Sequence, residues 1–382
     1  MTAGLPLRIA FLDSWLRESF AGSGTAVAIG GLATALMARG HTVERVVPRG
    51  AWPRSLLLRR LWFNWSLPPR MRTQAREHPY DLIVGFDIDG VRLAGAALAP
   101  YVCSIKGVLA EEARCERGWP RRMLSALAVL EGINARRAPL VLCTSRYCRE
   151  HIRDHYGVPM DRIAVVPEGI DLGRWQPSAD PAVLAEVEAR RDPFTVLCVA
   201  RQYPRKRIVD LIDAFALVTA REPRARLVVI GDGPEHPALV QRVLERGLRG
   251  SVRLLGALPD DDEVRSWYGR ASLFCLPSEQ EGFGIVFLEA MASGLPVVST
   301  TAAAIPEVVP HGEAGLLVPP RDPPALAEAL LQLLQNPSLR ARLRAGGRIH
   351  AQRFSWERVA DRFLEAVAPL AQQRSQAPVQ RA

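Results

Sequence analysis

The sequence predicts an α/β protein built from two Rossmann-like domains that face each other across a cleft. Short apolar runs alternate with helical patterns along the chain, which is typical of parallel sheets with crossover helices. A polar, proline-containing stretch at residues 171–193 interrupts this alternation, which then starts again. A length of 382 residues also fits two domains that each bury a core.

The apolar runs define the expected strands, and the patterns between them define the expected helices. In the first half, strands are expected at residues 7–12, 42–47, 82–86, 101–105, 140–143 and 163–166, with helices at 26–38 and 121–137. In the second half, strands are expected at 195–199, 226–230, 251–254, 272–276 and 297–299, and helices at 208–220, 237–246, 262–270 and 285–292.

These patterns predict domains at residues 1–175 and 176–352, followed by a final helix at 353–371. From 372 to 382 the composition turns to Gln, Arg and Pro, so we expect this tail to be disordered. In doubly wound domains a ligand binds where the carboxyl ends of the strands meet. The cleft is therefore the expected place for a site.

Composition excludes several classes of protein. The chain is 48% hydrophobic and 23% charged, which is ordinary for a globular protein and excludes collagen, coiled coil and disorder. No apolar run is long enough to span a membrane, and the start does not resemble a signal peptide. Six cysteines without a C-x-x-C motif indicate reduced thiols. We therefore expect a cytoplasmic protein without structural zinc.

The basic residues are unusual in kind. The chain has 49 Lys and Arg residues, but only two are lysines, Lys106 and Lys206. Where Arg serves as the general cation, a retained Lys can mark a need for a compact ammonium group, which a planar guanidinium cannot replace. Chance is the alternative explanation.

One segment, residues 52–76, holds six Arg, three Trp and no acidic residue. Four apolar residues fall at helical spacing on one side with two arginines beside them: Leu58, Leu61, Trp62, Trp65, Arg59 and Arg60. This pattern is typical of a helix in a membrane interface. The alternative is a core-facing helix whose Arg side chains extend to water. Because the charge is concentrated in one segment, a nucleic-acid-binding face is not expected.

The glycines after the first strand, Gly22 and Gly24, allow backbone N–H groups to approach a phosphate or hydroxyl. Val27 stands where the dinucleotide fingerprint needs a third glycine, so a nicotinamide or flavin site is not expected. The loop suits a contact with a sugar or a phosphate in the cleft, or it is a plain turn.

Polar residues follow two further strands of the first half. Asp87 and Asp89 flank one residue, so they could chelate a divalent metal, although a hydroxyl contact from Asp87 is the preferred interpretation. Lys106 ends the run at 101–105, which places it at the cleft edge of the predicted sheet. For Lys106 a plain salt bridge is the alternative to a functional role.

The second half carries a denser cluster. Arg201 and Lys206 lie in a cationic loop after the strand at 195–199. Further on, Gly282 and Gly284 flank Phe283 and allow close approach to the amides of a helix N-terminus, which favour a phosphate. A phosphate does not favour nearby carboxylates. Two acidic residues therefore more plausibly accept hydrogen bonds from sugar and ribose hydroxyls: Glu281 and Glu289.

This arrangement resembles the retaining glycosyltransferases of the GT-B fold, family four, the glycosyl transferases group 1. Glu281 and Glu289 stand at the two ends of the family's E-x7-E motif. By that resemblance Glu281 contacts the donor sugar, Glu289 contacts the nucleotide ribose, and Arg201 and Lys206 hold the donor diphosphate. Three residues match positions whose backbone amides face the phosphate or sugar: Gly284, Ile285 and Val286.

The resemblance implies metal-independent transfer of a sugar from a nucleoside diphosphate sugar to an acceptor hydroxyl, with retained configuration and without a cofactor. Arg201, Lys206 and Glu281 are the implied catalytic residues. The motif Phe354-Ser355-Trp356 resembles the start of a final helix that crosses back to the first domain. Residues 52–76 suggest a lipid-linked acceptor, contact with the inner face of the membrane, and a role in cell-surface glycan or glycolipid biosynthesis.

Four positions depart from the family pattern. Glu168 stands where Asn is usual, and Arg207 and Ala304 stand where Gly is usual. Many relatives also have a His where this chain has Lys106-Gly107. These departures leave undecided which residues bind the acceptor and whether one of them acts as a base.

Other functions remain open on the sequence alone. A nucleotide-sugar epimerase or a phosphorylase-like enzyme would share the architecture, and a single-sheet, metal-dependent transferase would use Asp87 and Asp89. A non-catalytic sugar-nucleotide-binding subunit is the non-enzyme alternative. Contacts that select the nucleotide base are expected near residues 256–259.

Overall fold

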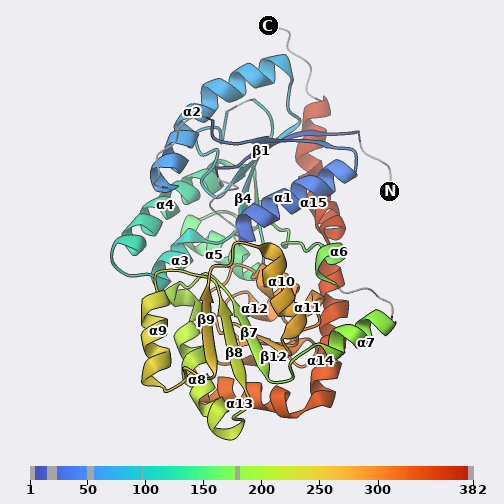
Figure 1. The fold of residues 1–382 in the computed structure, drawn as a ribbon. Coiled ribbons are helices and arrows are strands. Elements are labelled where there is room, and N and C mark those ends of the chain that lie inside the picture. The colour runs from blue at the N-terminus through green and yellow to red at the C-terminus, as the bar shows by residue number, and fades with distance from the viewer. Residues whose placement is uncertain (1–4, 15–23, 50–55, 97, 177–180, 377–382) are drawn as a thin grey trace. The chain divides into compact units, whose positions relative to one another are not determined.

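The computed structural model describes residues 5–14, 24–49, 56–96, 98–176 and 181–376 (Figure 1). The chain divides into two compact units, residues 1–169 with 356–382 and residues 170–355. Each unit is built around a six-stranded sheet in which every strand pair is parallel. The predicted α/β class with two Rossmann-like units is confirmed.

The first unit has the strand order β2-β1-β3-β4-β5-β6. Its strands are β1 (Arg8–Leu12), β2 (Thr42–Val46), β3 (Leu82–Phe86), β4 (Tyr101–Ile105), β5 (Leu140–Cys143) and β6 (Ile163–Val165). Its helices are α1 (Gly24–Ala38), α2 (Leu56–Glu77), α3 (Leu109–Cys115), α4 (Gly118–Arg137), α5 (Arg146–Tyr156), η1 (Met160–Arg162) and α15 (Trp356–Gln376). Strands β3 and β4 are buried along their whole length, as strands covered on both faces must be.

The second unit has the order β12-β11-β10-β7-β8-β9. Its strands are β7 (Thr195–Val199), β8 (Arg226–Ile230), β9 (Val252–Gly256), β10 (Leu273–Cys275), β11 (Val297–Thr300) and β12 (Gly315–Val318). Its longer helices are α7 (Pro181–Ala189), α8 (Ile208–Arg221), α9 (His236–Glu245), α10 (Asp261–Arg270), α11 (Ile285–Ala292), α13 (Pro323–Gln335) and α14 (Pro337–Ala351). Its short helical turns are α6 (Leu172–Trp175), η2 (Pro204–Lys206), α12 (Ile305–Val308) and η3 (Gln352–Phe354).

The end of the chain differs from the sequence expectation. The helical stretch from 323 onward is broken at Asn336, which caps α14 by accepting from the Leu339 amide, and Pro337 follows as the first helical residue. Helix α15 continues to Gln376, beyond residue 371, where we expected the last helix to end and a disordered tail to begin.

Helix α15 returns to the first unit and packs beside α1 (Figure 1). The contact needs two glycines, because a Cβ on Gly31 would lie 2.1 Å from the Trp356 ring and one on Gly169 would lie 2.4 Å from it. Further along α15, Phe363 meets Phe11 edge-on, with ring centroids 6.3 Å apart. The Trp356 ring thus packs directly against the backbone of Gly31 and Gly169, and this contact fixes the start of α15.

Gly31→Ala is expected to destabilise the first unit by about 1–3 kcal/mol, because the added methyl group overlaps the Trp356 ring. The matched control is Gly30→Ala in the same helix, where the nearest neighbour of the new Cβ is Arg45 at 3.8 Å. Alanine also favours helix over glycine, so the control does not lower the midpoint of thermal unfolding. Equal midpoints for the two variants would contradict this packing.

Candidate functional site

Two loops of the second unit meet at the carboxyl ends of neighbouring strands. Strands β7 and β10 pair in parallel, so the segments that follow them leave the sheet at the same edge. The amide of Glu279, after β10, donates to the carbonyl of Arg205, after β7, at 2.9 Å. This contact joins the cationic loop to the glycine-containing loop.

A nearly buried ion pair completes the junction of the two loops. The Lys206 ammonium lies 2.6 Å from Oε1 of Glu281, and the Ser278 hydroxyl donates to the same oxygen at 2.9 Å. The Lys206 and Glu281 side chains are only 14% and 9% exposed. The structure therefore brings two of the three predicted catalytic side chains into direct contact. Ser278 joins them, and the sequence offered no separate signal for it.

The turn into α11 presents backbone amides beside this pair. Gly284 has a φ of 91° and precedes the first helical residue, Ile285. At this backbone conformation a side chain is strained, and a Cβ would lie 2.6 Å from the Phe287 ring. The first amides of a helix lack partners within it, so those of Ile285 and Val286 are suited to an anion.

The residues between the two acidic groups anchor this turn. Phe283 is buried and meets Phe354 edge-on at 5.6 Å, whereas Gly282, Ile285 and Val286 are half-buried. Packing of Phe283 on one side thus leaves the backbone on the other side of the turn accessible.

Glu289 lies one turn further along α11. The Tyr268 hydroxyl donates to Oε2 of Glu289 at 3.1 Å. Burial raises the pKa of Glu289 to about 7, and the Tyr268 hydrogen bond and the charge of Arg174 oppose this shift. This carboxyl group is therefore protonated more readily than an ordinary glutamate.

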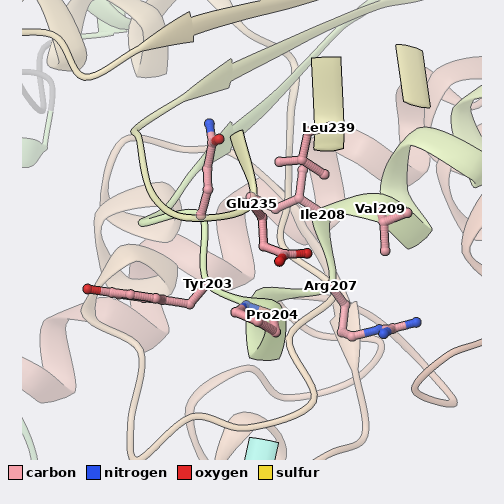
Figure 2. Close-up of a pocket in the computed structure, with 8 residues that line it drawn as sticks. Tyr203, Pro204, Arg207, Ile208, Val209, Glu235 and Leu239 are labelled. Atoms are coloured by element: carbon pink, nitrogen blue, oxygen red, sulfur yellow. The ribbon is translucent and has the colours of Figure 1, made fainter. Parts of the chain in front are cut away.

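Arg201 stays outside the Lys206–Glu281 pair. It is exposed, and its guanidinium lies over the Tyr203 ring, 5.7 Å from the centroid. Behind the same loop lies a small pocket whose lining includes Tyr203, Pro204, Arg207 and Glu235 (Figure 2). None of the predicted donor-binding residues lines that pocket.

The departures from the family pattern in this unit have a structural explanation. Arg207 has a φ of 51°, a left-handed conformation that glycine adopts without strain. Its guanidinium makes two hydrogen bonds to Asp210, at 2.9 and 2.7 Å, which offset part of that strain. Ala304 has an ordinary φ of −79°, so its backbone does not require glycine.

In the first unit, other side chains and backbone amides of the protein already contact the carboxylates of Asp87 and Asp89. Asp89 is fully buried and accepts from the Ser14 hydroxyl and amide at 2.6 and 2.9 Å and from Asn64 at 3.1 Å. Arg60 lies 3.6 Å from Asp87 and 3.7 Å from Asp89. In the described part of the chain, no group of three His, Cys, Asp or Glu side chains is arranged to hold a metal.

Lys106 also has a partner. Its ammonium lies 3.0 Å from Glu168, with the two side chains 11% and 6% exposed, and 5.5 Å from the centroid of the Phe86 ring. Its backbone amide donates to Asp87, which has a strained φ of 55°. Lys106 and Glu168, which both depart from the family pattern, thus contact each other as the salt bridge considered above.

The remaining predictions concern glycines and the basic helix. Gly22 lies outside the described residues, and Gly24 is an exposed first residue of α1. In α2, the stripe of four apolar residues defined above is exposed, at 40–62% of each residue's surface. The alternative of a core-facing stripe is therefore wrong, and Arg59 and Arg60 are buried instead.

Lys106→Met is expected to lower the free energy of unfolding by about 3–5 kcal/mol, because it leaves Glu168 buried without its cation. Adding Glu168→Met should restore most of that loss, as measured by denaturant unfolding. The control is Arg153→Met, which removes an exposed pair with Asp154 and leaves the unfolding midpoint unchanged. A double variant less stable than Lys106→Met would contradict the pairing.

Comparison with known proteins identifies the family of this chain. The family model for glycosyl transferases group 1 matches residues 193–336, and that for glycosyltransferase family 4 matches residues 22–174. A GDP-mannose-dependent α-(1-6)-phosphatidylinositol monomannoside mannosyltransferase of Mycobacterium tuberculosis is 31% identical over 302 residues, or 74% of this chain and 77% of that protein. A D-inositol 3-phosphate glycosyltransferase of Frankia alni is 34% identical over 256 residues, or 65% of this chain and 61% of that protein. The match thus spans less than two thirds of this second relative.

Solved structures share the fold. Sucrose-phosphate synthase of Thermosynechococcus elongatus superposes with a TM-score of 0.80 at 22% identity, covering 96% of this chain and all of that one. The Anabaena protein HepE, solved with UDP and glucose, gives 0.70 at 23% identity, covering 95% and 100%. The parallel sheets, the E-x7-E motif and the family matches lead to one conclusion: this chain belongs to glycosyltransferase family 4, the glycosyl transferases group 1, and has their GT-B fold.

Proposed function

We propose that the protein transfers a sugar from a nucleoside diphosphate sugar to an acceptor hydroxyl, with retained configuration. The observation that carries this proposal is the Lys206–Glu281 pair beside the amides that open α11. It offers a cation, free amides and a carboxylate within one pair of loops, which suits a diphosphate and a sugar hydroxyl. The names of relatives support it, since one is GDP-mannose-dependent and HepE was solved with UDP.

The chemistry follows from where charge develops. The bond between the sugar C1 and the diphosphate oxygen breaks, and negative charge collects on the leaving phosphate. Lys206, Arg201 and the helix amides supply the opposite charge, at about 1.5–3 kcal/mol for each charge-assisted hydrogen bond. A metal ion is not required for this charge balance. Glu281 accepts from a sugar hydroxyl and orients the ring.

Retention follows if the acceptor attacks on the face that the phosphate leaves. The acceptor oxygen then bonds to C1 while its proton passes to the departing phosphate oxygen. No side chain has to act as a general base, which agrees with the salt-bridged state of Lys106.

Lys206→Ala and Arg201→Ala are each expected to lower turnover about 10²–10³-fold, because each removes a preorganised cation from the developing charge. Turnover is measured as acceptor-dependent release of nucleoside diphosphate, using the donor that most raises the thermal midpoint in a panel of nucleoside diphosphate sugars. The control, Arg221→Ala at the exposed end of α8, keeps wild-type turnover. Full activity in either test variant, or release without acceptor, would overturn the proposed reaction.

We also propose that α2 docks on an anionic membrane that carries a lipid-linked acceptor, as in cell-surface glycan or glycolipid synthesis. Trp62 and Trp65 are 52% and 62% exposed, and their rings lie 5.3 Å apart. Arg72 and Arg76 are exposed further along the helix and can meet lipid phosphates. No described helix has the length and hydrophobicity needed to cross a bilayer. The contact would therefore be peripheral.

Trp62→Ser with Trp65→Ser is expected to reduce binding to phosphatidylglycerol vesicles at least tenfold, because it removes most of the exposed aromatic surface. Arg59 is unsuitable for this test, since it is buried. Ile349→Ser, which alters an exposed apolar residue of the second unit, serves as control and leaves binding unchanged. Equal partitioning of both variants in a flotation assay would favour an acceptor free in solution.

A further inference from the structure

The phenol of Tyr268 is a fully enclosed polar group near the proposed donor site. This residue of α10 has no exposed surface. Its ring stacks on Phe274 of β10, with centroids 5.8 Å apart and planes inclined by 10°, and the Trp175 ring meets it edge-on at 5.0 Å. This packing leaves the side chain no room to adopt another rotamer, so its hydroxyl has a fixed position.

That hydroxyl is directed at one acceptor, Oε2 of Glu289. Burial raises the pKa of Tyr268 well above its usual value, so the phenol remains a donor throughout the neutral range. No other hydrogen bond to the Glu289 carboxylate is found among the described residues. The second oxygen, Oε1, is therefore available to a ligand.

Among the described residues, two charged groups affect the ionisation of Glu289. Arg174 on α6 favours its ionised form, and Asp261 at the start of α10 opposes it. These two pair with each other at 3.0 Å, and both are exposed, so water screens their effect. Within the residues that the structure describes, the Tyr268 hydroxyl is the one hydrogen-bond donor to the carboxylate.

We propose that Tyr268 is a positioning residue for donor binding: its fixed hydroxyl holds one oxygen of Glu289 so that the other faces the ribose hydroxyls of the nucleotide. This inference rests on the proposed function, together with the ribose contact that the family resemblance implies for Glu289. Tyr268 itself touches no substrate and acts only through the carboxylate.

The arrangement has a consequence for pH. Ribose hydroxyls donate more strongly to a carboxylate than to a carboxylic acid. With a Glu289 pKa of about 7, donor affinity rises as pH increases through 7 and levels off above 8. Because the Tyr268 hydrogen bond lowers that pKa, its removal moves the rise to higher pH.

The test is Tyr268→Phe, which keeps the ring and its stacking. The KM for the nucleoside diphosphate sugar should increase about tenfold at pH 7, with little change in kcat. The deficit should shrink as pH approaches 9, because Glu289 then ionises without the phenol. A tenfold higher KM that is constant from pH 6 to 9, or an unchanged KM, would overturn the proposal.

The first unit offers a matched control. Tyr156 likewise donates its hydroxyl to a buried carboxylate, that of Glu131. Tyr156→Phe therefore removes the same kind of hydrogen bond at a site remote in function. It should lower thermal stability while leaving the pH dependence of the donor KM unchanged. A similar shift in both variants would indicate a general loss of stability and would contradict a role specific to Tyr268.

A second pair of measurements separates the inference from the function on which it rests. Glu289→Gln and a donor lacking both ribose hydroxyls should each raise the KM at pH 8 if Glu289 binds the ribose. If neither does, the role of Glu289 in the proposed function is wrong. If both do and Tyr268→Phe has no effect, only the role of Tyr268 is wrong.

Discussion

The ion pair between Lys206 and Glu281 is the contact on which the site of the second unit depends. Two separate loops supply its partners, and both side chains are almost excluded from water. An unpaired charge at that depth would be costly, so each loop holds the other in place. The amides of α11 and the Glu289 carboxylate belong to the helix that begins four residues after Glu281, so the same pair fixes their position as well.

Pairing of nearly buried charges recurs at the strand ends of the first unit. Lys106 joins Glu168, and Arg60 faces Asp87 and Asp89. Both lysines of this arginine-dominated chain thus contact a glutamate in a nearly closed space, where a compact ammonium fits more readily than a guanidinium. In the first unit the charges stabilise one another, whereas the glycine-containing turn of the second unit leaves donors for a ligand.

Much of the fold was predictable, because a strand that is covered on both faces is a continuous apolar run. Such a run can be recognised without knowing which strand it pairs with. The expected strands did not include β12 (Gly315–Val318), an edge strand whose last three residues are only half-buried, and the expected helices did not include α5, whose residues are mostly polar. The motif residues of the second unit were predictable from glycines and carboxylates at fixed spacing. Tyr268 and Ser278 were not, because a side chain that acts through another leaves no spacing signal in its own neighbourhood.

The basic helix shows a further limit of sequence patterns. Helical spacing correctly grouped Leu58, Leu61, Trp62 and Trp65 on one side of α2, but it could not say which side faces the core. Arg60 is buried on the inner side of α2 because its guanidinium faces the acidic residues that follow β3, Asp87 and Asp89. Such a preference depends on a tertiary contact with residues more than twenty positions away.

Seating Trp356 on Gly31 and Gly169 also affects the order in which the protein can be completed. A ribosome makes residues 1–169, then the whole second unit, and only then the helix that covers α1. The second unit is continuous, so it can close while synthesis is still under way. The first unit begins earlier, but its packing of Trp356 on Gly31 and Gly169 has to wait until the residues from 356 onward emerge. During that interval the backbone of these two glycines lacks the indole ring that covers it in the folded protein.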